Sequence, residues 1–239
     1  MVGVGRYCAL TRRASPHPAA GAVAGLLVGI LLAGALAARD VATSHGERDR
    51  APVPVAARRV DVDAFTNAWR RSRTGTWFVR MAFTRRTAAR GRLDDELRIA
   101  QRPPDRLIVG PLGAVAGRIG DRTVNCGTGA TGVLRCAAEQ QAPPYAVEVD
   151  REVSALRSYF TGSVPLYALD RQGDCFTLRL RRLYPSPPYG DRARFCFDRV
   201  TGAPTRREIH RPEGTDVQQA VEVRTEVSAA DLRLPVAAG

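Results

Sequence analysis

The chain has 239 residues, of which 36 are basic and 24 acidic, so its formal net charge is +12. Its length fits one or two domains, and a hydrophobic content of 44% excludes a chain that is disordered throughout. Every basic residue is an arginine, as is typical of a GC-rich genome, and no basic run resembles a nucleic-acid-binding arm. The charge therefore gives no reason to expect a nucleic acid as partner.

The N-terminal region predicts export. Residues 19–38 carry no charge, and twenty helical residues span about 30 Å, the thickness of a bilayer core. Arg6, Arg12 and Arg13 precede this stretch, which predicts a cytoplasmic tail over residues 1–18 and a single-pass transmembrane signal-anchor. The alternative is a signal peptide cleaved near Ala35-Leu36-Ala37, which would release a secreted protein. Both interpretations place the rest of the chain outside the cytoplasm.

The segment that follows has the composition of a linker. Residues 39–59 mix arginine, aspartate, serine, glycine and proline without an apolar period, so we expect a flexible connection. The folded extracytoplasmic domain is then expected to span residues 60–239. Its first element is predicted to be a short helix capped by Asp61 or Asp63, with three apolar side chains on one face: Phe65, Ala68 and Trp69.

After this helix the apolar period changes to two, which predicts strands. The first strand has alternate apolar residues at Trp77, Val79, Met81 and Phe83. A return strand carrying Leu97 and Ile99 is expected to end at the proline pair 103–104. Short or weaker strands are expected to follow at residues 107–109, 114–126 and 133–136.

The second half of the domain is predicted to contain a second helix and further strands. A helix is predicted over residues 151–160, with Asp150 as its cap, and strands resume at residue 175 and continue to the end of the domain. An antiparallel meander of strands with helices inserted defines the fold class α+β.

Five cysteines agree with export. Cys8 lies in the predicted cytoplasmic tail, and an even set in an exported domain favours two disulfides, Cys126–Cys136 and Cys175–Cys196. Apolar and polar residues alternate in segments 175–180 and 192–197, so antiparallel pairing about the turn at residues 185–186 places Cys175 opposite Cys196. Four reduced, buried thiols are the alternative. A zinc site fits less well, because the chain has no Cys-x-x-Cys spacing.

The last third of the domain carries a recognisable order of elements. A strand ends in Asp198-Arg199-Val200-Thr201-Gly202-Ala203-Pro204, a strand with basic residues follows, and a final strand comes after a Glu-Gly turn. Asp198 can bond its own turn amides and Gly202 tolerates a positive φ. This order resembles the LolA-like family of exported lipid-binding domains, which includes LppX, LprG and RseB-type relatives. The resemblance covers residues 174–235 well and residues 60–173 loosely. The apparent anchor and the two disulfides depart from the family pattern.

The resemblance implies a strongly curved antiparallel half-barrel whose concave face is covered by helices. In such lipoprotein-carrier-like folds the hollow between sheet and helices holds an acyl chain or another apolar ligand. The residues implied to line this cavity are Trp77, Val79, Met81, Phe83, Leu97, Ile99, Phe176, Leu178 and Leu180. The alternative for each of them is an ordinary core position.

No motif in the chain predicts an enzyme or a cofactor. Of the three histidines only His210 lies in the predicted domain, so a catalytic triad or a histidine metal site lacks its parts. The run from Gly127 to Gly132 matches G-x-G-x-x-G but is interpreted as a hairpin tip, because a strand follows it. Arg70, Arg71 and Arg73 either touch lipid phosphates or form a solvated face.

The sequence thus predicts an extracytoplasmic, membrane-anchored, non-enzymatic domain that binds a lipid or other apolar ligand as a carrier or sensor. The alternative is a regulatory module that binds the outer segment of a membrane protein. No metal is expected in either case.

Overall fold

The computed structural model describes residues 58–128, 134–137 and 140–234, which all belong to one compact unit. The predicted tail, anchor and most of the predicted linker lie outside the described residues, as do residues 129–132 of the glycine-rich run. Within the described ranges, no helix is both long enough and apolar enough to cross a membrane.

The described chain consists of two α-helices, one 3-10 turn and a set of strands. The helices are α1 (Arg59–Thr74) and α2 (Tyr145–Ser158), and the turn is η1 (Pro111–Gly113). The strands of the first half are β1 (Trp77–Thr87), β2 (Gly91–Arg102), β3 (Asp105–Val109), β4 (Val115–Ile119), β5 (Arg122–Thr128), β6 (Leu134–Cys136) and β7 (Gln140–Gln141). Those of the second half are β8 (Tyr167–Gln172), β9 (Cys175–Leu180), β10 (Arg192–Phe197), β11 (Pro204–Arg211) and β12 (Gly214–Arg224).

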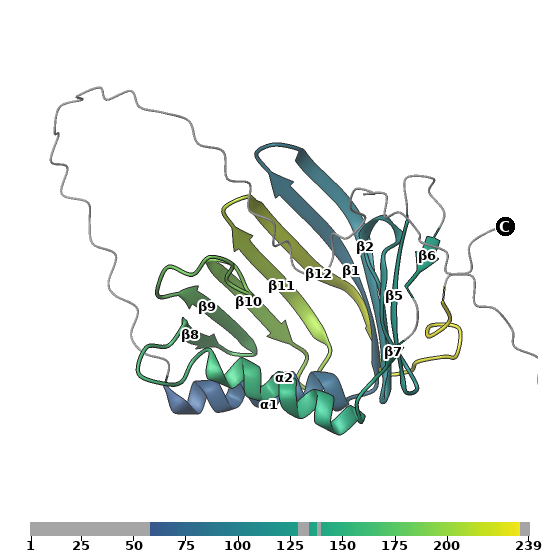
Figure 1. Cartoon of the computed structure of the whole chain (residues 1–239), viewed down its shortest axis with the longest axis horizontal. Helices are drawn as coiled ribbons and strands as arrows, with labels where there is room; N and C mark the ends of the chain where they lie inside the picture. The colour runs from purple at the N-terminus through teal and green to yellow at the C-terminus, as the bar shows by residue number, and fades with distance from the viewer. Residues whose placement is uncertain (1–57, 129–133, 138–139, 235–239) are drawn as a thin grey trace, which may run out of the picture. The chain divides into compact units, whose positions relative to one another are not determined.

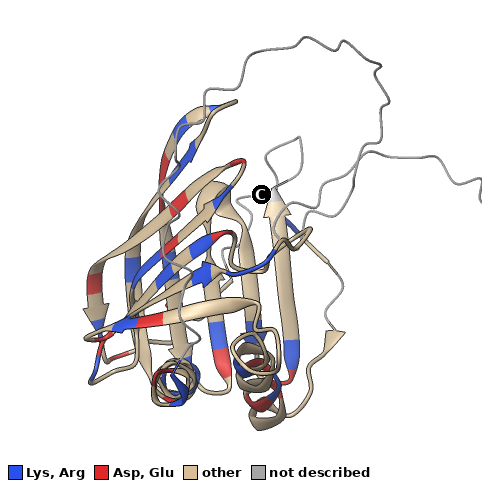
Figure 2. Cartoon of the chain, turned by 90° about the vertical axis from the view of Figure 1, so that its left-hand side faces the viewer, with Lys and Arg blue, Asp and Glu red and all other residues tan. Residues whose placement is uncertain are grey.

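All of these strands join one antiparallel sheet. Its order is β6-β5-β4-β3-β2-β1-β12-β11-β10-β9-β8, and β7 pairs with β5. Each half is a meander, and the halves meet where β1 pairs with β12 in the middle of the sheet. Figure 1 shows α1 and α2 side by side across one end of the strands, and Figure 2 shows the same pair of helices end-on. The predicted α+β class is confirmed.

The helices pack on one face of the sheet, which we call the inner face. Phe65 of α1 is fully buried, and its ring centre lies 5.0 Å from that of Phe176 on β9 and 5.8 Å from that of Phe195 on β10. Phe160, just after α2, packs 5.7 Å from the same ring. This aromatic contact fixes both helices to strands β8–β11, because each large ring removes much apolar surface from water.

The opposite, outer face is covered in the first half of the sheet by the segment after β12. Leu232 of this segment is buried in a cluster with Phe78, Leu107 and Val124. The Arg224 guanidinium lies 3.9 Å from the centre of the Phe78 ring and pairs with Asp231 at 2.6 Å. The chain's last described segment is therefore part of the core.

Both helices begin earlier than their predicted caps. Helix α1 begins at Arg59, so Asp61 lies in its first turn, where it pairs with Arg58 at 2.8 Å. Helix α2 begins at Tyr145 after Pro144, and Asp150 is an internal residue that pairs with Arg70 of α1 at 2.6 Å. Asp63 also lies inside α1, where it pairs with Arg157 at 2.6 Å. The predicted caps were wrong because these carboxylates lie within the helices, and neither helix has a side-chain cap.

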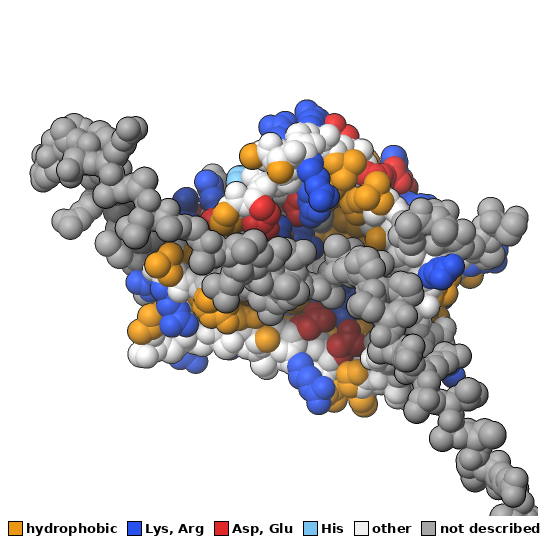
Figure 3. Space-filling model, turned by 45° about the horizontal axis from the view of Figure 1, so that its top comes forward, with side chains coloured by type: hydrophobic (Ala, Val, Ile, Leu, Met, Phe, Trp, Pro, Cys, Tyr) orange, Lys and Arg blue, Asp and Glu red, His pale blue; other side chains and the backbone are white. Residues whose placement is uncertain are grey.

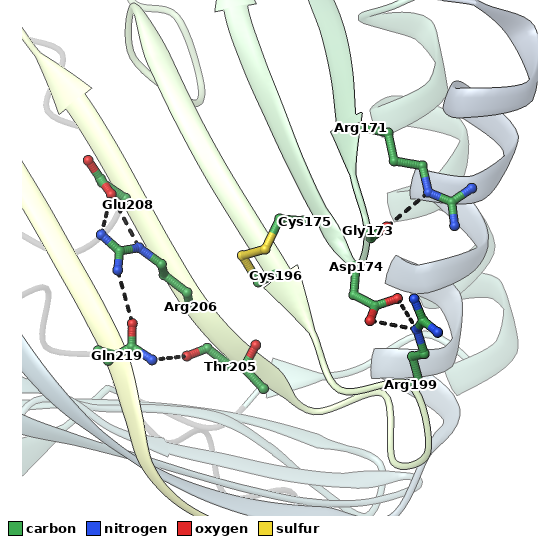
Figure 4. The surroundings of a disulfide bond; sticks show 10 residues. All are labelled: Arg171, Gly173, Asp174, Cys175, Cys196, Arg199, Thr205, Arg206, Glu208 and Gln219. Carbon is green, nitrogen blue, oxygen red and sulfur yellow. Dashed lines mark hydrogen bonds and ion pairs between the residues drawn. A yellow bond between two sulfur atoms is a disulfide. The ribbon is translucent and has the colours of Figure 1, made fainter.

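Both predicted disulfides are confirmed. Cys126 lies opposite Cys136 on β5 and β6, and Cys175 lies opposite Cys196 on β9 and β10. The second disulfide is on the outer face, because its cysteines alternate with the inner-facing phenylalanines. Figure 4 shows it between the Asp174–Arg199 pair and a group formed by Arg206, Glu208 and Gln219. The two disulfides indicate an extracytoplasmic domain.

The turn that carries the family resemblance has its expected local chemistry. The Asp198 side chain accepts hydrogen bonds from the backbone N–H of Val200 at 3.0 Å and of Thr201 at 2.7 Å. Gly202 has a φ of +75°, and a Cβ there would lie 2.9 Å from the backbone carbonyl of Arg71. The turn therefore packs directly against the last turns of α1.

Candidate functional site

The residues predicted to line a cavity all lie on the inner face, but in separate clusters. Five of them, Trp77, Val79, Met81, Leu97 and Ile99, form one cluster on β1 and β2. Phe176 and Leu178 belong to the cluster beneath the helices, and Leu180 packs against it. Phe83 is buried on the same face of β1. The structure thus brings them to one face, and their role in binding stays a prediction.

Neither helix contributes a described residue to the β1–β2 cluster. Its other apolar members are Ala203, Ile108 of β3 and Ala220 of β12, and the Trp77 indole donates to the main-chain carbonyl of Ser72 in α1 at 3.0 Å. Trp77, Val79 and Met81 are fully buried. By contrast, the cluster on β8–β11 contains Val62, Phe65 and Ala68 of α1 and Leu156 of α2. The apolar inner face thus extends past the part of the sheet on which the helices pack.

Arg207 lies on the inner face between these two clusters. On β11 it pairs with Phe195 of β10 on one side and with Gln218 of β12 on the other. Its guanidinium carbon lies 5.9 Å from the centre of the Phe195 ring. The side chain is exposed, and yet burial among the surrounding groups lowers its pKa. Protein groups thus surround the Arg207 guanidinium, while part of its surface remains accessible to solvent.

An aromatic wall stands beside Arg207. The ring of Tyr189, in the β9–β10 loop, lies 5.3 Å from Phe195 and 6.4 Å from Trp69 of α1. Trp69 in turn lies 5.8 Å from Phe195. Burial raises the pKa of Tyr189 to about 12, and the neighbouring Tyr159 adds to the shift while Arg207 opposes it. The Tyr189 phenol therefore stays protonated at neutral pH and is able to donate a hydrogen bond.

The carboxylates near this wall already have partners. Asp216 accepts two hydrogen bonds from Arg85, at 2.6 and 2.8 Å, and one from Arg211 at 3.1 Å. Burial alone would raise the pKa of Asp216, but these arginines outweigh it and lower the pKa. Glu152 of α2 lies 3.1 Å from Arg73 and 3.3 Å from the Trp69 indole nitrogen. In the described chain, Arg207 has neither a hydrogen bond nor an ion pair.

A buried polar network joins the helices to the first half of the sheet. Glu148 of α2 lies 2.6 Å from Arg73 of α1 and 2.9 Å from Arg118 of β4. Gln101 of β2 donates to the main-chain carbonyl of Arg73 at 2.9 Å and to the Tyr145 hydroxyl at 2.8 Å. Arg73 was considered as a lipid contact or a solvated charge, but only 5% of it is exposed, because it bridges the helices.

A cleft of about 400 Å³ opens where α1 begins and α2 ends. Its walls combine apolar side chains with arginines, and its lining residues are Arg59, Val62, Arg157, Phe160, Thr161 and Gly162. Arg157 is held by Asp63 at 2.6 Å. On the face shown in Figure 3, hydrophobic and basic side chains likewise share the visible surface.

The described residues contain no group of three or more His, Cys, Asp and Glu side chains that could hold a metal ion. His210 lies next to Glu208, with 2.7 Å between its Nε2 and the carboxylate, and its Nδ1 lies 3.1 Å from the Thr215 hydroxyl. Glu208, His210 and Thr215 thus form a hydrogen-bonded polar cluster on β11 and β12.

Sequence reasoning did not assign Trp69, Tyr189 or Arg207 to the site. Trp69 was recognised only as part of an apolar helix face, and Tyr189 lies in a proline-rich turn. Arg207 is two residues before Ile209 on β11 and so lies on the same inward face, which was the available signal for an inward-facing arginine.

No protein-family model and no curated protein sequence matches the chain. Its fold is similar to that of MucB in the Pseudomonas aeruginosa MucA/MucB complex, with a TM-score of 0.40, 13% identity, and coverage of 74% of this chain and 63% of that one. It is also similar to a LolA superfamily protein from Nitrosomonas europaea, with a TM-score of 0.32, 7% identity, and coverage of 71% of this chain and 96% of that one. A third similar structure is a DUF1329 family protein from Desulfovibrio piger, with a TM-score of 0.30, 9% identity, and coverage of 73% of this chain and 98% of that one. The chain thus covers less than two thirds of the MucB chain.

Proposed function

We propose that this domain is a non-enzymatic, extracytoplasmic binding domain that holds a lipid or another apolar ligand on the inner face of a half-barrel sheet. One observation carries the proposal: the buried apolar inner face continues onto β1 and β2, where neither helix adds a described apolar side chain to the cluster. Two disulfides support the compartment.

The binding mechanism we propose is burial of an acyl chain along this face. Removing apolar surface from water contributes about 25 cal/mol for each Å². Trp69 and Tyr189 supply rings that are only half buried, so they are able to contact a chain without unpacking the core. Residues 19–38 would keep this activity near the membrane surface, and the nine predicted lining residues would form the floor of the site.

The test uses the full chain exported into an oxidising compartment, in a lipid nanodisc if its anchor is retained. The chain has two tryptophans. Trp69 lies on α1, and Trp77 lies on the inner face of β1. A brominated acyl chain quenches indole fluorescence only at close contact. We expect saturable quenching by 9,10-dibromostearate and by 9,10-dibromostearyl alcohol, and a lipid in the organic extract of the purified protein.

Two variants locate the binding. Ala220 is half buried and packs against the β1–β2 cluster, whereas the adjacent Gln219 is exposed on the outer face. Ala220→Phe is expected to weaken quenching about tenfold, because the ring removes the volume of several methylenes. The matched control Gln219→Phe is expected to leave it unchanged. Absence of saturable quenching by either probe, with no co-purified lipid, would overturn the proposal and favour the outer segment of a membrane protein as partner.

A further inference from the structure

The charge on Arg207 is a feature of the inner face that lipid-chain binding does not explain. Two nearby arginines have carboxylate partners, unlike Arg207. Arg206, the preceding residue, pairs with Glu208 at 2.8 Å on the outer face, and Arg211 pairs with Asp216 at 3.1 Å. Within the described residues Arg207 has only the face of the Phe195 ring.

The Arg207 guanidinium has no carboxylate partner of its own in the described chain. Burial opposes the charged form of Arg207, and an arginine nevertheless remains protonated because its pKa is far above neutral. Every charged group that faces it is accounted for. Asp216 attracts it but already holds Arg85 and Arg211, and Arg211 repels it. A bound anion would therefore supply the counter-charge that the fold itself does not supply.

Tyr189 provides a second donor at the same place. Its ring contacts Phe195, over which Arg207 lies, and Tyr189 and Arg207 influence each other's titration. The described residues offer no hydrogen-bond partner to the Tyr189 hydroxyl. A neutral phenol and a guanidinium together form a charge-assisted donor pair, which suits a carboxylate or a phosphate oxygen. The rings of Trp69 and Phe195 continue this pair as an apolar surface.

We propose that Arg207 and Tyr189 form a head-group site, and that the ligand of this domain is an acidic amphiphile with a carboxylate or phosphate at its end. The guanidinium binds the anion, the Tyr189 hydroxyl donates to the same group, and the chain runs over the aromatic wall onto the β1–β2 cluster. This inference rests on the proposed function and adds the chemical class of the ligand to it.

The experiment compares two probes that differ only in their head groups. Dissociation constants for 9,10-dibromostearate and 9,10-dibromostearyl alcohol are measured by tryptophan quenching on the exported full chain. Since a hydrogen bond to a charged group contributes measurably more than a neutral one, we expect Arg207→Gln to weaken stearate binding about tenfold to a hundredfold. Alcohol binding is expected to change less than about threefold, because the alcohol carries no charge to lose. Tyr189→Phe is expected to weaken stearate binding by a smaller factor.

The control is Arg206→Gln, which removes a charge one residue away on the opposite face and is expected to leave both affinities unchanged. Arg207→Lys keeps the charge and is expected to restore part of the stearate affinity. Dodecyl phosphate is expected to compete with stearate, whereas acetate and inorganic phosphate at the same concentration are not, which separates an amphiphile from a free anion.

The outcomes separate the two proposals. Equal affinities for both probes, together with no selective loss in a folded Arg207→Gln variant, would reject the head-group site and leave lipid binding standing. Failure of both probes would reject the proposed function itself. Competition by free phosphate or acetate would show a site for small anions and would also reject the amphiphile. Thermal unfolding of each variant shows that it is folded before its affinity is interpreted.

Discussion

Arg73 of α1 and Glu148 of α2 form an ion pair of 2.6 Å that fixes the end of one helix to the beginning of the other. Glu148 also lies 2.9 Å from Arg118 of β4, so a single carboxylate joins both helices to the sheet. Arg73 and Arg118 are 5% and 7% exposed. The position of the helices over the inner face depends on this contact.

Replacing Glu148 is therefore expected to destabilise the fold. Breaking a buried pair costs about 3–5 kcal/mol, and since a quarter of the Glu148 side chain is exposed we expect Glu148→Gln to lose about 2–3 kcal/mol. Urea unfolding measures the loss. The control is Asp150→Asn on the same helix, whose pair with Arg70 is exposed and is expected to contribute less than about 1 kcal/mol. Equal losses in the two variants would contradict this role of Glu148.

The disulfides are expected to differ in the stability they contribute. Cys126 and Cys136 are separated by 10 residues, and Cys175 and Cys196 by 21. Each crosslink typically stabilises by about 2–4 kcal/mol, and the longer loop contributes somewhat more. Urea unfolding of the Cys126→Ser/Cys136→Ser and Cys175→Ser/Cys196→Ser double variants tests the order. Alkylation without reductant is expected to modify none of these four cysteines in the wild-type protein.

The stability of the domain is expected to depend on pH through Asp231, in the segment after β12. Hydrogen bonds from Arg224 and Ser228 lower the pKa of Asp231 to about 2, although burial opposes the shift. A carboxyl whose pKa is lower in the folded state stabilises the fold above its unfolded pKa, and this stabilisation is lost as the pH falls toward 2. We expect Asp231→Asn to be less stable than wild type at pH 7, with the difference shrinking between pH 4 and pH 2. A constant difference in urea midpoint across that range would contradict the assignment.

The close approach of the Asp198–Pro204 turn to α1 predicts a strong effect of one methyl group. Gly202→Ala places a Cβ 2.9 Å from the Arg71 carbonyl in a left-handed conformation, so we expect a loss of about 2 kcal/mol or more. Gly173 also has a positive φ, of +61°, but no atom lies within 4 Å of its Cβ position. Gly173→Ala is therefore the control, with an expected loss of about 1 kcal/mol from backbone conformation alone. Thermal unfolding compares the two.

Local patterns predicted the features that depend on neighbouring residues in the chain. Alternation located β1, β9 and β10 and placed Cys175 opposite Cys196, and the turn residues at Asp198 and Gly202 behave as their chemistry requires. The helix starts were wrong, because Asp61 and Asp150 look like caps until their arginine partners are known.

The candidate site depends on contacts between distant segments, which explains why the sequence did not assign it. Arg207 becomes distinctive only when Phe195 is known to lie on one side and Asp216 is known to be bound by Arg85. Arg73 likewise reads as a surface charge until α2 brings Glu148 to it. In both cases the deciding partner lies on another element, and periodicity along one element carries no information about it.

The pairing of β1 with β12 has a consequence for how the domain matures. These are the first and last strands of the described chain, and they are neighbours at the centre of the sheet. Each flanking meander closes through short hairpins, but the central seam needs residues from both ends, so it has the highest cost of loop closure. A chain that emerges from a translocation channel N-terminus first cannot complete this seam until β12 has emerged. The central seam is therefore completed last, and until then β1 presents an unpaired strand edge that is open to pairing with another chain.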